Sequence, residues 1–308
     1  MNRLATSHNA PVCASCHTAI SGRVVQALGH AWHPDHFRCA ACGEPIDDAQ
    51  FPVRDNRPYH PACYREHLLP RCAWCQQPLE GQYYLDSWGN AYCPAHQDEW
   101  PPCVYCGRLV TDGAGPDVEA RARCTTCRKA AIEDDGTAAV ILPPLVDWLQ
   151  GKGITLDQAV RFRVQLVSRR ELQRSEREGP DVLGKALVTR RAGANSATHL
   201  ELHLLRGMPS PLFEGVAIHE LGHAWLACRG VRGLPAWGEE GFCELLSHRW
   251  YSDVDTVETR YYAQRIAGND SPVYGGGFRR LRELAESMGF DRLIDHLAAK
   301  RALPPVPG

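Results

Sequence analysis

Cysteine and histidine recur at metal-ligand spacing between residues 11 and 130, and this pattern constrains the fold more than any other feature of the sequence. The chain has 14 Cys, and all except Cys228 and Cys243 lie between Cys13 and Cys127. Most of them occur in pairs separated by two residues, a spacing that lets a tight knuckle direct both side chains at one ion. No secretory signal precedes them, so we interpret them as zinc thiolates of a reducing compartment rather than as disulfides.

The first four donor pairs predict two zinc sites, each built from two pairs. The expected ligands are Cys13, Cys16, His33 and His36 for zinc 1, and Cys39, Cys42, His60 and Cys63 for zinc 2. His67 is a weaker candidate than His60, because three residues rather than two separate it from Cys63.

Four further pairs follow and predict two more sites. The expected ligands are Cys72, Cys75, Cys93 and His96 for zinc 3, and Cys103, Cys106, Cys124 and Cys127 for zinc 4. With these sites every Cys of the N-terminal half is used. A closed four-ligand site has no open position for a substrate, so the four zincs are expected to be structural. Metal binding would supply the folding energy that such small modules lack.

Length and charge exclude several classes of protein. The 308 residues are enough for about two domains. A formal net charge of -2 and the lack of a basic reading helix argue against a nucleic-acid binder, including one of the zinc-ribbon type. No apolar run is long enough to span a membrane, and the N-terminus has no apolar signal region. We therefore expect a cytoplasmic protein without membrane association.

The composition changes after an acidic segment at 131–137, which we interpret as a boundary. Apolar and polar residues alternate from Val160 to Leu166 and from His199 to Leu205, which predicts two half-buried strands. Two helices are expected at Phe213–Cys228 and Glu239–Trp250, followed by helical segments broken at 268–271, 275–277 and 289. The predicted fold class is therefore α+β, with zinc-finger modules followed by a domain that has a small mixed sheet and an active-site helix pair.

Two histidines in the first of these helices form a candidate catalytic metal site. His219 and His223 are four residues apart, so both imidazoles project from one face and can reach one ion. Glu220 lies between them, where it can accept a proton from a metal-bound water as general base. Two His and one carboxylate would leave a fourth position for that water. We interpret Cys228 and Cys243, which lack ligand spacing, as buried thiols.

The third ligand is expected from the second helix. The string Trp237-Gly238-Glu239-Glu240-Gly241-Phe242 resembles the gluzincin arrangement, in which a helix opening with Glu-Gly supplies a glutamate. By register with that motif Glu240 is the ligand, and Glu239 is the alternative. Glu244 lies one turn further on, and it either holds a ligating His by its other nitrogen or is an ordinary surface carboxylate.

A donor to the oxyanion of the reaction is also needed. Our candidate is Tyr274, because the glycines of Tyr274-Gly275-Gly276-Gly277-Phe278 could let its hydroxyl move toward the metal. The competing candidates are Tyr261, Tyr262 and His248. By analogy with zincin-type enzymes, the strand His199–Leu205 would be a sheet edge that binds an extended peptide.

The local string Ala31-Trp32-His33-Pro34-Asp35-His36-Phe37-Arg38-Cys39 closely resembles the LIM double zinc finger. His36 and His60 stand where LIM domains usually have Cys. We therefore expect a LIM domain at 11–69, a degenerate LIM-like double finger at 70–130 and a zincin-like metallopeptidase domain of the gluzincin type at 138–303.

The whole order resembles the ubiquitin-activated LIM peptidases of plant organ-size control and their bacterial relatives. The most specific strings are His219-Glu220-Leu221-Gly222-His223-Ala224-Trp225-Leu226, Glu239-Glu240-Gly241-Phe242-Cys243 and Tyr274-Gly275-Gly276-Gly277-Phe278-Arg279. The resemblance implies cleavage of protein substrates, in that family ubiquitin-system enzymes, and activation by ubiquitin attachment. Plant members carry acidic ubiquitin-interacting helices before the LIM unit, which here starts at Cys13, so we expect a stand-alone protease of the bacterial type.

The sequence thus predicts a zinc endopeptidase with one catalytic and four structural Zn²⁺. We expect a protein or peptide substrate, and protein partners that bind through the LIM modules. The alternative is a non-catalytic LIM adaptor with a pseudopeptidase domain.

Overall fold

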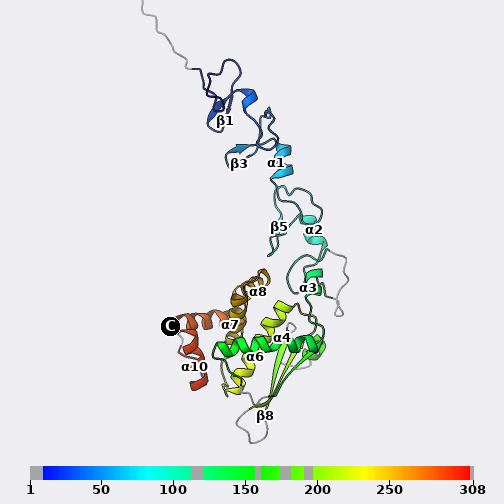
Figure 1. Ribbon diagram of the computed structural model, residues 1–308, viewed down its shortest axis with the longest axis vertical. Helices are drawn as coiled ribbons and strands as arrows, with labels where there is room; N and C mark the ends of the chain where they lie inside the picture. Colours follow the sequence, from blue (N-terminus) through cyan, green and yellow to red (C-terminus); the bar gives the residue numbers. More distant parts are fainter. Residues whose placement is uncertain (1–9, 112–120, 157–160, 174–181, 191–196, 306–308) are drawn as a thin grey trace, which may run out of the picture. The chain divides into compact units, whose positions relative to one another are not determined.

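The chain divides between Pro101 and Pro102 into two separately packed units. The computed structural model describes residues 10–111, 121–156, 161–173, 182–190 and 197–305 (Figure 1). The division falls inside the segment 70–130, so the fourth Cys cluster belongs to the same unit as the C-terminal helices. The domain limits expected from the sequence stay predictions.

The first unit consists of short hairpins, each followed by a short helix. The strands are β1 (Val25–Ala27), β2 (His30–Trp32), β3 (Val53–Arg54), β4 (Arg57–Pro58), β5 (Tyr84–Leu85) and β6 (Ala91–Tyr92). The helices are η1 (Pro34–His36), α1 (Pro61–His67) and α2 (Pro94–Glu99). Each helix begins with Pro directly after a donor residue. Proline at the first helical position needs no N–H bond and has a preset φ, which favours helix formation there.

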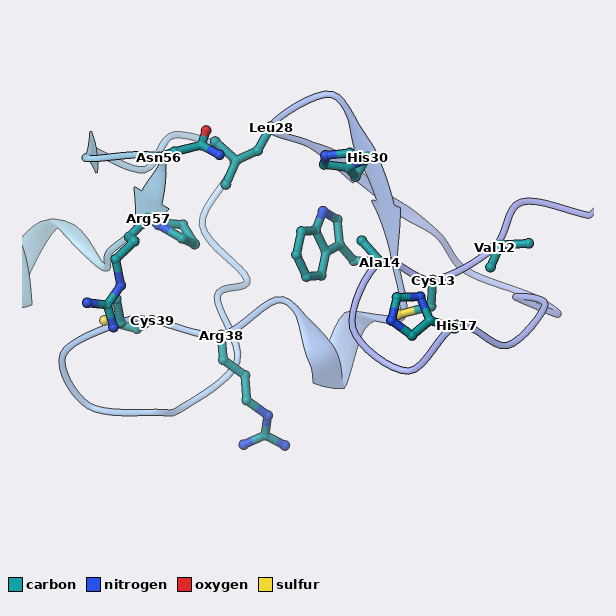
Figure 2. Close-up of a pocket in the computed structure, with 13 residues that line it drawn as sticks. Val12, Cys13, Ala14, His17, Leu28, His30, Arg38, Cys39, Asn56 and Arg57 are labelled. Carbon is teal, nitrogen blue, oxygen red and sulfur yellow. The ribbon is translucent and has the colours of Figure 1, made fainter.

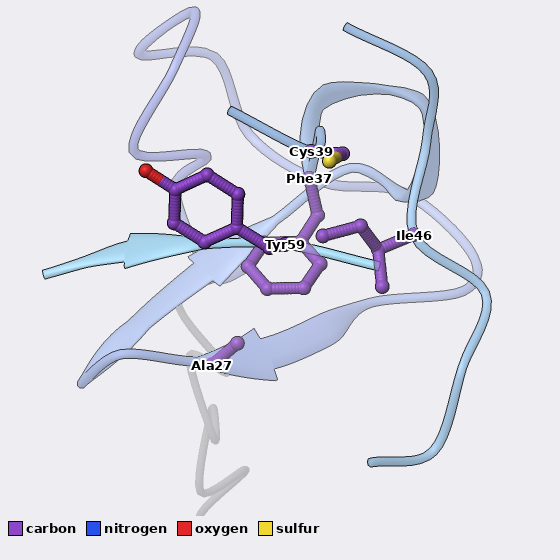
Figure 3. Close-up of a cluster of buried hydrophobic side chains, with 5 residues drawn as sticks. All are labelled: Ala27, Phe37, Cys39, Ile46 and Tyr59. Atoms are coloured by element: carbon purple, nitrogen blue, oxygen red, sulfur yellow. The ribbon is translucent and has the colours of Figure 1, made fainter. Parts of the chain in front are cut away.

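A small apolar cluster lies between the first two finger modules (Figure 3). Its buried members are Ala27, Phe37, Cys39, Ile46 and Tyr59. Phe51 packs on Phe37 with ring centroids 4.9 Å apart. A core of this size cannot stabilise a domain by burial alone, which agrees with a fold that depends on bound metal.

The second unit has a three-stranded sheet and a group of helices. The elements are α3 (Thr125–Lys129), α4 (Asp135–Gly151), β7 (Arg161–Val167), α5 (Arg169–Leu172), β8 (Gly184–Arg190), β9 (Ala197–Leu205), α6 (Ser210–Cys228), α7 (Ala236–Val254), α8 (Val257–Ala267), α9 (Tyr274–Met288) and α10 (Phe290–Lys300). Zinc-finger-type modules therefore precede an α+β domain, as the sequence predicts. The expected boundary at 131–137 is itself structured, since Asp134 caps α4 through the Thr137 N–H and Ile132 is buried.

The strand order β7-β9-β8 corrects one expectation. The predicted strand His199–Leu205 is the central strand β9, parallel to β7 and antiparallel to β8. Its alternation therefore reflects burial inside the sheet rather than an edge position. The edge strand next to the metal helix is β8, which the sequence analysis did not identify. The expected start of the first strand, Val160, lies outside the described residues.

The Gly275–Gly277 segment corrects a second expectation. These glycines form the first turn of α9 rather than a break or a flexible hinge. A Cβ at Gly277 would lie 2.1 Å from the carbonyl oxygen of Trp237 and 3.0 Å from the Cα of Gly241. The glycines thus let α9 approach α7 at backbone distance, directly beside Glu240. Helix packing, and not mobility, explains why glycine stands here.

Among the residues that the structure describes, none of the helices has the length and apolarity needed to cross a bilayer.

Candidate metal centres and active site

Four groups of Cys and His meet at ligand distance, and their members are the sets expected from the sequence. The groups are Cys13, Cys16, His33 and His36; Cys39, Cys42, His60 and Cys63; Cys72, Cys75, Cys93 and His96; and Cys103, Cys106, Cys124 and Cys127. In each group the candidate ligand atoms all lie within 4.8 Å of one another. These clusters support zinc binding.

The second cluster illustrates how a finger prepares its ligands. The ring of His60 donates through Nε2 to the Pro45 carbonyl at 3.0 Å, which leaves Nδ1 facing Cys42 Sγ at 3.4 Å and Cys63 Sγ at 3.9 Å. Donors on one tetrahedral zinc would lie about 3.5 Å apart. Burial raises the pKa of Cys39, but backbone N–H groups, including that of His60, outweigh it and lower the pKa to about 6. The knuckle thus favours a thiolate.

A cleft lies between the first two finger modules (Figure 2). It has a volume of about 850 Å³ and an apolar part that includes Leu28 and Trp32. Its basic lining residues are Arg38, Arg57, His17 and His30. Cys13 and Cys39 also line it, and no carboxylate does so among the described residues. The cleft is therefore electrostatically suited to a negatively charged segment.

The fifth candidate metal site lies between helices α6 and α7. His219 Nε2 and His223 Nε2 are 3.2 Å apart, and Glu240 Oε2 lies 3.2 Å from the first and 3.5 Å from the second. Three donors held by one tetrahedral zinc at about 2.0–2.1 Å would be separated by about 3.3 Å. The three atoms therefore fit the face of a zinc coordination tetrahedron. Hydrogen bonds from both imidazoles lower the pKa of Glu240 to about 2 despite the opposing effect of burial.

Two other carboxylates approach the far nitrogens of the same imidazoles. Glu244 Oε1 lies 3.7 Å from His219 Nδ1, and Glu239 Oε1 lies 3.2 Å from His223 Nδ1. Glu240 thus faces the Nε2 atoms, whereas Glu239 and Glu244 face the Nδ1 atoms. Carboxylates in that position orient ligating histidines and raise their basicity.

Glu220 is buried beside the histidines with 7% of its surface exposed. Burial and the nearby Glu240 carboxylate raise the pKa of its carboxyl, while His219, His223 and the Ala186 N–H of β8 lower it. A Cβ at Gly184 would lie 2.9 Å from Glu220 Cγ, so this glycine lets the edge strand pass directly over the carboxylate. A buried carboxyl with a raised pKa is suited to proton transfer near neutral pH.

The four candidate oxyanion donors have different surroundings in the structure. Burial and the carboxylates of Glu240 and Glu244 raise the pKa of Tyr274, so its ring lies within electrostatic reach of the metal-site group. It is 41% exposed at the start of α9. Tyr261 and Tyr262 lie close to the fourth Cys cluster, and His248 packs on Phe278. Their surroundings make them weaker candidates than Tyr274.

Cys243 belongs to this site although the sequence analysis treated it only as a buried thiol. Its sulfur lies within 4.8 Å of ligand atoms of His219 and His223, and its side chain is 0% exposed. Burial raises the pKa of its thiol to about 11. The signal in the sequence was its position three residues after Glu240, on the same face of α7.

Comparisons with known proteins cover both parts of the chain. Residues 13–68 match the family model of the LIM domain, and residues 150–259 match the DA1-like model described as Protein DA1. A rice protein named LIM domain-containing protein HDR3 is 26% identical over 97% of this chain and 75% of its own length. From Arabidopsis thaliana, Protein DA1-related 2 is 27% identical over 95% of this chain and 70% of its own length. Protein DA1 itself is 25% identical over 95% and 68%. These matches support a LIM domain and a DA1-like region.

Proposed function

We propose that this protein is a zinc-dependent peptidase with its catalytic centre between α6 and α7. The observation that carries the proposal is the triangle of His219 Nε2, His223 Nε2 and Glu240 Oε2, whose sides of 3.2, 3.2 and 3.5 Å suit one zinc ion. A buried carboxyl, Glu220, lies beside it, as peptide hydrolysis at a metal-bound water requires. The gluzincin-type fold and the count of one catalytic and four structural zincs are part of this proposal.

Each residue of the site has a separate role in this proposal. His219, His223 and Glu240 hold the metal, and Glu239 and Glu244 orient the two imidazoles. When bound, zinc supplies a Lewis acid and lowers the pKa of a coordinated water to ~7. Glu220 accepts the proton of the attacking water and delivers it to the leaving amine. Tyr274 donates its hydroxyl hydrogen to the oxygen on which negative charge develops.

The edge strand β8 is the proposed platform for the substrate backbone. Among the described strands it pairs with β9 alone, and we propose that an extended peptide adds along its other edge. Ala186 of this strand already donates its N–H toward Glu220, so a peptide added along β8 would run past the general base. This pairing would position a scissile bond without demanding a particular side chain.

Comparison of the wild-type protein with Glu220→Gln tests the proposal. Both proteins should carry the same amount of zinc, because Glu220 is not a ligand. Cleavage of a mixed peptide library, followed by mass spectrometry of the new termini, should fall by about 10²–10⁴-fold in the variant. Glu283→Gln on the exposed face of α9 is the matched control and should cleave normally. Equal, background-level cleavage by wild type and Glu220→Gln would favour the alternative, a non-catalytic LIM adaptor.

For the LIM segment we propose binding of a protein partner in the cleft between its fingers. The basic lining and the absence of a carboxylate among the described lining residues favour an acidic, extended segment with an apolar side chain over Trp32. A fluorescent peptide of alternating Glu and Leu should bind more tightly than its Lys counterpart, and more weakly in Arg57→Glu. Arg23→Glu, outside the cleft, is the control. Equal binding of both peptides would contradict this assignment.

A further inference from the structure

The fourth Cys cluster differs from the other three in its surroundings. Its four sulfurs are all buried, whereas Cys42 of the second cluster is exposed. It packs in the same unit as α6–α10, while the other three clusters lie in the first unit. Its neighbours are therefore the elements that build the proposed catalytic centre.

The chain leaving this cluster pairs with the segment that enters α6. The Ile132 N–H donates to the Met208 carbonyl at 2.9 Å, and the Gly207 N–H donates to the Ile132 carbonyl at 2.8 Å. Ala131 and Pro209 form an antiparallel bridge between these two hydrogen bonds and the start of the helix. Residues 130–132 and 207–210 thus form a short two-stranded ladder. Its last residue on the first strand, Ile132, is five residues after Cys127.

The same ladder supplies an acceptor to the first turn of α6. The N-cap residue of this helix is Pro209, and no side-chain cap hydrogen bond is formed there. The first N–H groups of a helix have no partner within it. The Ser210 N–H instead donates to the Ala130 carbonyl at 2.8 Å. The chain from the fourth cluster therefore caps the helix that carries both histidines.

An arginine next to a cluster ligand strengthens this connection. Arg123 directly precedes Cys124, and its Nη1 donates to the Gly207 carbonyl at 2.8 Å. The same atom lies 3.3 Å from Glu133 Oε1. A charge-assisted bond of this kind ties the position of the Cys124 knuckle to the loop before α6.

A second connection leads from the cluster to the other ligand helix. Tyr105, between Cys103 and Cys106, accepts a hydrogen bond through its carbonyl from Arg265 Nη1 of α8 at 3.4 Å. Tyr262 of α8 packs on Tyr251 of α7, with ring centroids 5.6 Å apart. The cluster therefore supports α6 directly and α7 through α8.

We propose that the fourth zinc site is a positioning element of the catalytic centre, which caps and orients α6 and so sets the affinity of the helix pair for its own zinc. This rests on the proposed function only in taking His219, His223 and Glu240 as a metal site. The other three clusters belong to the first unit.

The first test uses Arg123→Gln in the full-length protein, with Arg260→Gln as control. Arg260 lies on α8 and forms an exposed ion pair with Asp255. Arg123→Gln should keep the fourth zinc, because no ligand changes. Hydrogen exchange should become about tenfold faster for amides in the first turns of α6. The zinc of the helix-pair site should also pass more readily to a chelator. Exchange and zinc release at wild-type rates in Arg123→Gln would overturn the proposal.

The second test compares ligand loss at two clusters, with zinc counted by mass spectrometry of the metal. Cys75→Ser should lose one zinc per chain, from the third cluster alone. Cys106→Ser should lose two, because the helix-pair site weakens together with the fourth cluster. Loss of a single zinc from Cys106→Ser, with α6 exchange unchanged, would contradict the proposal.

These readouts separate the positioning role from the peptidase activity. Zinc counts and amide exchange require no substrate, so a wild-type protein without cleavage could still show the coupling. A wild-type protein that cleaves peptides, together with an uncoupled Cys106→Ser, would instead remove the positioning role and leave the peptidase proposal intact.

Discussion

The knuckle clusters of the first unit and the helix-pair site of the second unit place their metal donors by different means. A knuckle holds two donors a few residues apart, and short backbone N–H bonds to sulfur, such as that from His60 to Cys39 at 3.4 Å, organise them locally. At the helix pair, Glu240 meets His219 from another helix, and a buried core that includes Trp225 and Phe242 fixes both helices. We therefore expect the knuckles to need the ion in order to fold, and the helix pair to form without it.

This contrast predicts that zinc removal acts very unequally on the two regions. Zinc contributes about 10–16 kcal/mol of apparent folding energy to finger modules. After chelation, amides at 13–101 should exchange at nearly the unfolded rate, while those around Phe242 and Leu281 stay protected. Hydrogen exchange resolved by mass spectrometry measures both regions in one sample. Equal loss of protection in both would show that the helix pair also depends on metal to fold.

A second prediction concerns the identity of the third ligand. Glu240→Gln should weaken zinc binding at the helix pair by roughly 100-fold or more and abolish peptide cleavage, because a neutral amide replaces a charged donor. Glu239→Gln should keep the zinc and lose less activity, because its carboxylate faces only His223 Nδ1. Metal analysis after gel filtration distinguishes the two. Zinc loss from Glu239→Gln with retention in Glu240→Gln would reverse the assignment.

The close packing of α9 on α7 predicts that alanine substitutions at two neighbouring glycines will have very different effects on stability. Gly277→Ala should destabilise the second unit by about 1–3 kcal/mol, since the new Cβ would meet the Trp237 carbonyl at 2.1 Å. Gly276→Ala, whose Cβ would meet only the Ser271 carbonyl oxygen at 3.5 Å, should be neutral or stabilising by up to about 1 kcal/mol. Thermal unfolding followed by circular dichroism compares the two. Similar Tm values would mean that α9 can move away from α7.

The smallest expected effect is on the pH profile. Glu220 must be deprotonated to act as a base, and burial raises its pKa above the ordinary value of 4.5. As the pH falls, kcat/KM should therefore decline at a higher pH than an exposed glutamate would give. The zinc content, measured in parallel, should stay constant over this limb. If the decline in kcat/KM instead follows the loss of zinc, the pH dependence would be due to protonation of the metal ligands and not of Glu220.

The spacing of the Cys and His residues allowed the metal donors to be predicted from the sequence. A knuckle or one helix turn brings residues that are close in sequence together, whatever the rest of the fold is. The same reasoning could identify β7 and β9, whose apolar residues alternate. It missed β8, because Gly184-Lys185-Ala186-Leu187 has no clear alternation. The need for glycine at position 184 arises from close contacts with Leu204, Val216 and Glu220, which belong to other elements. The same reasoning also took Gly275–Gly277 for a hinge, since close packing against Gly241 cannot be seen in local sequence.

The ladder between residues 130–132 and 207–210 has a practical consequence for anyone who divides this chain. A fragment that starts at 138, where the composition changes, would lack the strand that closes the first turn of α6. A fragment that starts at Pro102 would keep it, and recombination with other finger modules should succeed at that junction. The boundary between the two packed units thus lies between the third and fourth cysteine clusters, and the last finger belongs to the same unit as the helix-pair site.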